Sequence, residues 1–88
     1  MTREDFLARL QREGYAEIVT VERAANGELD EHTHPFAALA LILDGEIEIR
    51  CAGERRLYRA GDIFRLAAET LHSERYGPAG VRYLVGRK

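Results

Sequence analysis

Cysteine and long apolar stretches are both scarce in this chain of 88 residues. Cys51 is the only cysteine, so no internal disulfide can form. It alternates with Ile47 and Ile49, where a small buried hydrophobic residue is expected rather than a nucleophile. No apolar run approaches the roughly 18 residues of a membrane-spanning helix, and acidic residues occupy the place of an export signal. We therefore expect a cytoplasmic protein without a membrane partner.

The sequence also lacks an excess of positive charge, internal repeats, linkers and low-complexity segments. Its formal net charge is −2, which provides no basic surface for nucleic acid. Its length permits one domain with a small core, and such domains often gain stability from a metal ion or a second subunit. We expect a single small globular domain that does not bind nucleic acid.

The first residues predict a short helix. Thr2 stands three residues before Asp5, which is close to a capping box. The apolar residues that follow share one side of this helix: Phe6, Leu7 and Leu10. Gly14 is a natural helix stop. We therefore expect an N-terminal helix in residues 1–14 and one β domain in residues 15–88.

The rest of the chain predicts short strands separated by turns. Patterns of β-branched and alternating residues place these strands at 15–24, 36–43, 46–51, 56–59, 63–66, 71–76 and 81–85. Asp44-Gly45 is the strongest hairpin signal, and residues 77–80 separate the last two strands. Residues 36–43 could instead form a buried helix, but their place between Pro35 and Asp44 favours a strand. Seven or eight short strands predict an all-β fold, either an antiparallel sandwich or a small barrel.

Three histidines are the residues best suited to carry chemistry. His32 and His34 stand two residues apart, so their side chains point to the same face of a β-strand. Pro35 biases His34 toward an extended backbone, which supports a strand or a strand end here. Neutral imidazole is the commonest metal ligand, and His72 arriving from elsewhere would complete a facial site. The alternative is a surface pair with an unrelated His72.

Around these residues the sequence resembles the cupin family, small β-barrels with a metal site in the lumen. The first cupin motif, G-x5-H-x-H-x3,4-E-x6-G, is matched, with one residue fewer after the first glycine, by Gly27, His32, His34 and Gly45. The second motif, G-x5-P-x-G-x2-H-x3-N, is matched by Gly61 and His72. Its proline, glycine and asparagine are replaced here by Ala67, Glu69 and Tyr76. The resemblance spans residues 16–85 and implies a small cupin-like jelly-roll barrel.

The same resemblance implies a metal site with His32, His34 and His72 as ligands. Ala38 stands where the family usually has a glutamate ligand, so the implied site has three histidines and no carboxylate. Such a site leaves open coordination positions and an uncompensated charge, which favours an anionic ligand. One divalent transition metal is expected, and zinc, iron, nickel, copper and manganese all remain open. The alternative is a cupin that has lost its metal and keeps the histidines as polar groups.

Several functions fit these expectations. The first is a metal-dependent oxygenase, isomerase or lyase acting on a small acid, and the others are a non-catalytic ligand-binding or sensing module and a metal-free structural cupin. Glu74 and Tyr76 share strand parity with His72, so Glu74 could supply a carboxylate ligand, although such residues more often form a solvated face. No nucleophile with a positioned base is evident, so no catalytic residue is named.

Strand parity divides the apolar run of residues 36–43 into two faces. If Ala38 faces the metal, Ala40 and Ile42 face it too, which makes a small apolar wall with room for a ligand. The alternate residues then form an outward row: Leu39, Leu41 and Leu43. This row needs a cover, and we expect a second subunit to provide it in a homodimer. The alternative cover is the N-terminal helix, through Phe6, Leu7 and Leu10.

Overall fold

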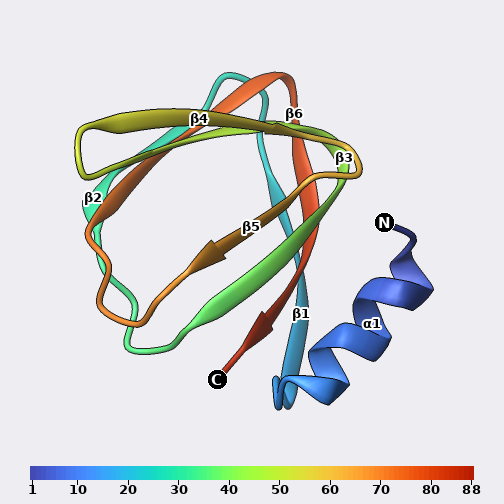
Figure 1. The fold of residues 1–88 in the computed structure, drawn as a ribbon. Helices are drawn as coiled ribbons and strands as arrows, with labels where there is room; N and C mark the ends of the chain where they lie inside the picture. Colours follow the sequence, from blue (N-terminus) through green and yellow to red (C-terminus); the bar gives the residue numbers. More distant parts are fainter.

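The computed structural model describes residues 1–88, which form one helix and six strands (Figure 1). In chain order the elements are α1 (Arg3–Arg12), β1 (Glu17–Arg23), β2 (Glu28–His32), β3 (Ala38–Cys51), β4 (Glu54–Arg59), β5 (Ile63–Leu66) and β6 (His72–Arg87). The strands pair only in antiparallel fashion and curl into a barrel, with α1 on the outside. The predicted all-β barrel with a short N-terminal helix is confirmed.

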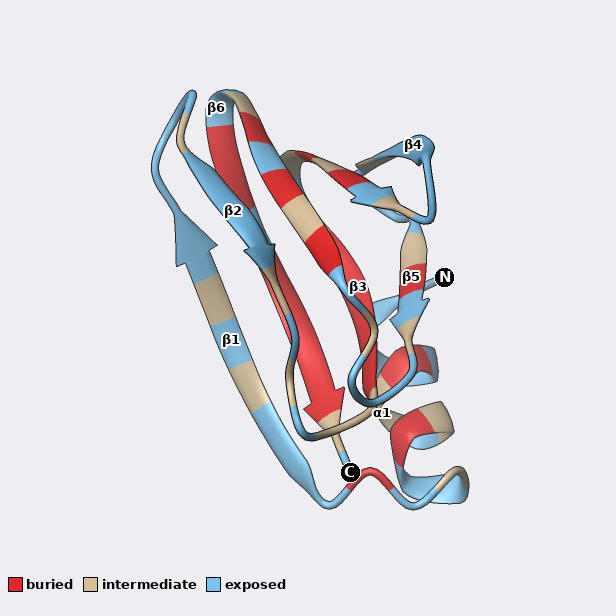
Figure 2. Cartoon of the chain, turned by 90° about the vertical axis from the view of Figure 1, so that its left-hand side faces the viewer, coloured by how far each residue is buried: buried red, intermediate tan, exposed pale blue.

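The two long strands, β3 and β6, run through both halves of the barrel. They pair with each other from Ala38–Arg87 at one end to Cys51–His72 at the other. In one half, β1 pairs with the end of β6 and β5 pairs with the beginning of β3. In the other half, β2 pairs with the beginning of β6 and β4 with the end of β3. Burial follows the same plan, since the buried residues run along β3 and β6 while β1 and β2 are largely exposed (Figure 2).

The predicted hairpin at Asp44-Gly45 is wrong, because β3 continues through both residues. The β3–β6 register shifts here twice, between Ile42 and Asp44 and between Gly45 and Ile47. Gly45 has φ +75°, and a Cβ at this position would collide with the backbone of Gly80. The two residues therefore form an irregularity where a long strand bends between the halves of the barrel, and not a chain reversal.

The predicted turn at residues 77–80 is likewise wrong. β6 runs unbroken from His72 to Arg87, so two predicted strands are one. Gly80 has φ +73°, and it lies opposite the bend of β3. The glycines that suggested turns thus mark the place where the two backbones cross closely. As a result the barrel has six strands, two of them long, instead of seven or eight short ones.

The helix forms as its end signals predict and packs on the outer face of the sheet. Thr2 caps it by accepting a hydrogen bond from the Asp5 backbone N–H at 3.1 Å. Phe6 and Leu10 are fully buried against the outward leucines of β3, together with Leu84 of β6. Leu39 and Leu41 are accordingly 0% and 2% exposed within one chain. The cover of the leucine row is therefore α1, and the row does not itself require a second subunit.

The inner core confirms the predicted strand parity. Ala38, Ala40 and Ile42 are buried in the lumen with the inward residues of β5 and β6. Residues 36–43 thus belong to a strand and not to a buried helix. Cys51 was expected to be buried, but it is only half-buried, because it stands at the end of β3 where the lumen opens. The structure contains no helix that is long and apolar enough to span a membrane.

Candidate metal centre

The three histidines meet at one point inside the barrel, together with Glu74. His32 ends β2 and lies directly opposite His72, the first residue of β6. His34 follows β2 just before Pro35, and Glu74 stands two residues after His72 on the same face of β6. One ligand atom from each of the four lies within 4.8 Å of the others. Residues from two neighbouring strands and the segment after one of them therefore form a single cluster of donors.

Backbone carbonyls fix the orientation of two of the imidazole rings. Nδ1 of His32 lies 2.7 Å from the Asp30 carbonyl oxygen, and Nδ1 of His72 lies 2.9 Å from that of Thr70. A carbonyl oxygen only accepts, so each Nδ1 must carry the proton. In the neutral rings, both Nε2 atoms are then free to bind a cation.

The Nε2 atoms of these rings converge on one carboxylate oxygen. Oε2 of Glu74 lies 3.1 Å from Nε2 of His72 and 3.4 Å from Nε2 of His32. Nε2 of His32 is buried and makes no hydrogen bond. Lone pairs facing a carboxylate oxygen are unfavourable unless a proton or a cation lies between them. The donor set therefore fits a bound cation.

The surroundings hold the carboxylate of Glu74 in place and keep the imidazole of His34 neutral. Glu74 also accepts a hydrogen bond from the Tyr76 hydroxyl at 3.0 Å on its other oxygen. Burial, followed by the charge of Glu74, raises the pKa of Tyr76 well above its usual value and the pKa of Tyr83 to about 12. Burial, followed by the neighbouring His32, lowers the pKa of His34 below its usual value. Low basicity favours the neutral imidazole, which is the form that binds metal.

A small cavity of about 60 Å³ opens beside the cluster. All four donors line it, and Ala38 contributes a small wall, as strand parity predicts. Its other charged lining residues are Arg23 and Arg87. Two guanidinium groups against one carboxylate give the cavity an excess of positive charge, although the whole chain carries a net charge of −2. The cavity therefore favours an anion.

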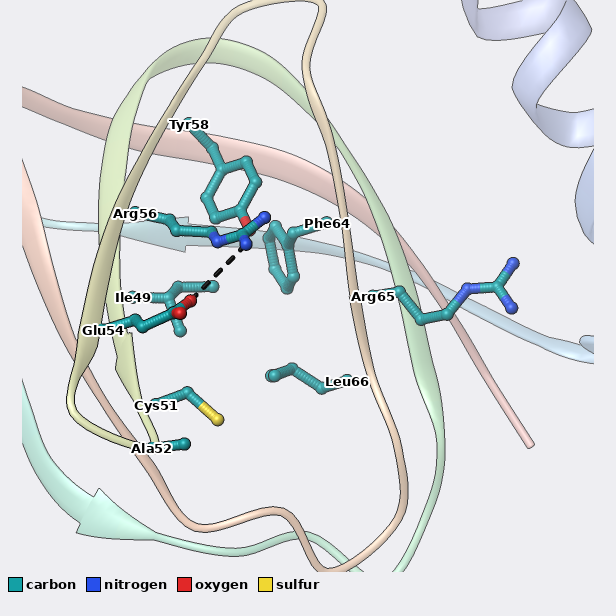
Figure 3. Close-up of a pocket in the computed structure, with 9 residues that line it drawn as sticks. All are labelled: Ile49, Cys51, Ala52, Glu54, Arg56, Tyr58, Phe64, Arg65 and Leu66. Carbon is teal, nitrogen blue, oxygen red and sulfur yellow. Dashed lines mark hydrogen bonds and ion pairs between the residues drawn. The ribbon is translucent and has the colours of Figure 1, made fainter.

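A larger pocket of about 250 Å³ lies on the other side of Phe64 and Leu66, which line both spaces. It opens between β4 and β5, and none of the four clustered donors reaches it. Figure 3 shows its lining, with Cys51 and Ala52 at one end and the Glu54–Arg56 ion pair, 3.4 Å long, between two residues of β4. Both partners of this pair are largely exposed, so the pocket offers an apolar recess without a desolvated polar group.

The sequence identifies the three histidines, and the structure brings all three together. Glu74, named from its parity with His72, joins them, whereas a solvated face was the commoner expectation for such a residue. Sequence reasoning missed Arg23 and Arg87. Both follow the alternation of inward residues along β1 and β6, which was the available signal.

One family profile matches most of this chain. A family model described as an AraC-like ligand binding domain covers residues 14–85. That range includes β1 to β5 in full, β6 as far as residue 85, and all four clustered donors. No curated protein matches the chain at a significant level.

Many solved structures share the fold. A protein of unknown function from Rhizobium leguminosarum bv. viciae superposes with a TM-score of 0.75 at 17% identity, over 80% of this chain and 66% of its own. For an RmlC-like cupin from Shewanella frigidimarina the TM-score is 0.68 at 18% identity, covering 80% and 63%. For the DMSP lyase DddQ from Ruegeria pomeroyi it is 0.73 at 25% identity, covering 81% and 36%. The chain thus spans less than two thirds of the length of these proteins.

Proposed function

We propose a function from the premise that the chain belongs to the AraC-like ligand-binding domain family and is a small cupin. The protein binds one divalent transition-metal ion through His32, His34, His72 and Glu74, and it uses the adjoining cavity to bind a small anionic molecule. The observation that carries this proposal is the convergence of four donor atoms within 4.8 Å of one another. One of the four residues, His32, has a buried Nε2 atom without a hydrogen-bond partner.

The chain's own residues prepare the site for an ion. The carbonyls of Asp30 and Thr70 hold two rings in the tautomer that presents Nε2, and Tyr76 holds the carboxylate of Glu74. When bound, the metal would act as a Lewis acid that polarises an oxygen of the ligand. Imidazole and carboxylate donors suit zinc, iron, nickel, copper and manganese, so the proposal is limited to a divalent transition metal.

Glu74 changes the charge expected of the site. A three-histidine centre leaves both positive charges of the ion unbalanced, whereas Glu74 balances one of them. One positive charge of the ion remains, and Arg23 and Arg87 add to it at the cavity wall. A small anion is therefore still the ligand class that we propose.

Elemental analysis of the purified, untagged protein tests the metal proposal. We expect close to one transition-metal ion per chain after supplementation, and a loss of at least tenfold in affinity for each of His32→Ala, His34→Ala, His72→Ala and Glu74→Gln. Glu31→Gln, an exposed neighbour of His32, is the matched control and keeps the ion. A wild type without metal, or a His72→Ala protein that binds as well as wild type, would refute the proposal.

An enzyme is the second candidate function, and binding without turnover is the first. The description of the matching family as a ligand-binding domain favours it. One of the similar structures is a lyase, which keeps the enzyme candidate open. Incubation of the metal-loaded protein with small carboxylic acids separates the two, because an enzyme consumes an acid that a binding module only retains.

We also propose a homodimer, but the leucine row that predicted it from the sequence is not its interface. The outward leucines of β3 are already covered by α1, so a second subunit would have to use another surface. What still supports association is the general need of small domains for additional buried area.

A further inference from the structure

Arg87, the last residue of β6, lines the histidine cavity and has a buried polar atom without a partner. Its Nη1 donates to Oε1 of Glu17 at 3.1 Å, which anchors one edge of the guanidinium. Its Nε is buried and makes no hydrogen bond. A buried N–H group without an acceptor carries an uncompensated desolvation cost. The group is therefore prepared for an acceptor that the chain does not supply.

The position of the guanidinium is further fixed by Phe36. The Cζ atom of Arg87 lies 4.7 Å from the centroid of the Phe36 ring, and His34 stacks on the same ring with 4.9 Å between centroids. The arginine is thus tied through one aromatic ring to a member of the donor cluster. Arg23, the other arginine of the cavity, is exposed and has no buried orphan atom. Arg87 is therefore the better placed of the two to recognise a ligand.

We propose that Arg87 binds the carboxylate of a small carboxylic acid held in this cavity. The inference rests on the proposed function and adds the residue that selects the ligand. The Nε edge of a guanidinium presents two parallel N–H donors, which match the two oxygens of a carboxylate. A space of about 60 Å³ holds roughly two water molecules, so it admits little more than the acid group itself beside the histidines.

Calorimetry on the cobalt-loaded protein tests this assignment with glycolate and its neutral analogue glycolamide. We expect wild type to bind glycolate at least tenfold more tightly than glycolamide. Arg87→Gln should weaken glycolate binding by about 10- to 100-fold and leave glycolamide unchanged, because one charge-assisted pair is lost. Arg87→Lys keeps the charge without the two-donor edge and should fall in between. Glu17→Gln removes only the ion pair and should stay within about threefold of wild type.

The cobalt content and visible spectrum of the same samples separate the two possible failures. If wild type and Arg87→Gln bind cobalt and glycolate equally well, the role of Arg87 is overturned and the metal proposal stands. If wild type binds no cobalt, the metal proposal fails, and Arg87→Gln must still weaken glycolate binding to the metal-free protein. Should Arg87→Gln not fold, wild-type affinity in Arg87→Lys overturns the assignment. Phosphate binding more tightly than glycolate overturns the carboxylate class.

Discussion

Ala38 and Glu74 lie on different strands of one lumen, and only one of them carries a donor. Ala38 occupies the position of the usual glutamate ligand and contributes a small, buried wall. Glu74, on the neighbouring strand β6, brings its carboxylate within 3.4 Å of two imidazole nitrogens. The barrel closes around a common centre, so a donor can enter from another strand without disturbing the histidines. The carboxylate that the cupin resemblance lacked in one place is available in another.

The Tyr76 hydroxyl should strengthen the proposed metal site through Glu74. Tyr76→Phe removes one hydrogen bond from the carboxylate and should weaken metal affinity by about tenfold, as is usual for groups that orient a ligand. Tyr83→Phe is the matched control, since this buried tyrosine lines the cavity but makes no hydrogen bond to Glu74. Competition with a chelator measures both variants. Equal affinities would contradict a positioning role for Tyr76.

The three histidines could be predicted from the sequence because strand parity and the order of the two motifs each depend on few residues. The same parity indicates Glu74. Arg87 was missed because the last strand was expected to end at residue 85, whereas it extends to Arg87. Glu69, in place of a motif glycine, still adopts φ +59°. The backbone there requires a conformation that the side chain alone does not predict.

At the scale of elements, β3 and β6 show the limit of local turn signals. Asp44-Gly45 is favourable for a tight turn because glycine accepts a positive φ. A bend in a long strand makes the same demand on the backbone. Only the partner strand distinguishes the two cases, since Gly45 lies against Gly80, far away in the sequence. The number of strands was therefore overestimated, although the two faces of residues 38–43 were assigned correctly.

Gly45 should be far less replaceable than a glycine in an open turn. Gly45→Ala places a Cβ against the Gly80 backbone and should cost at least about 3 kcal/mol, from a positive φ and forced separation of the strands. Gly53→Ala has a similar φ with nothing within 4 Å, and it should cost about 1 kcal/mol. Urea denaturation gives both values. Equal losses would mean that β3 and β6 separate here without cost.

For the whole molecule, 88 residues leave little stability in reserve. The core is divided by the sheet into a lumen cluster and a smaller cluster under α1. A bound ion that links β2 to β6 would add to the stability that these two clusters provide, because a ligand that binds only the folded state stabilises that state.

Removal of the metal should lower the melting temperature of the entire domain. An ion at one hundred times its dissociation constant adds about 2.7 kcal/mol, which corresponds to a shift of roughly 10–20 °C for a domain of this size. Circular dichroism with and without chelator measures the shift in wild type. His72→Ala, which lacks one donor and should bind at least tenfold more weakly, should show about half of this shift or less. A wild type that is insensitive to chelator would contradict a metal contribution to stability.

The order of the donors along the chain also has a kinetic consequence. His32 and His72 become neighbours only when β2 pairs with β6, which closes a loop that contains β3, β4 and β5. Closing so long a loop is slow and is characteristic of late contacts in β-rich proteins. An ion at this site therefore finds its ligands only in a nearly finished barrel. We expect the ion to leave the folding rate unchanged and to slow unfolding, because it stabilises the folded state and not the transition state.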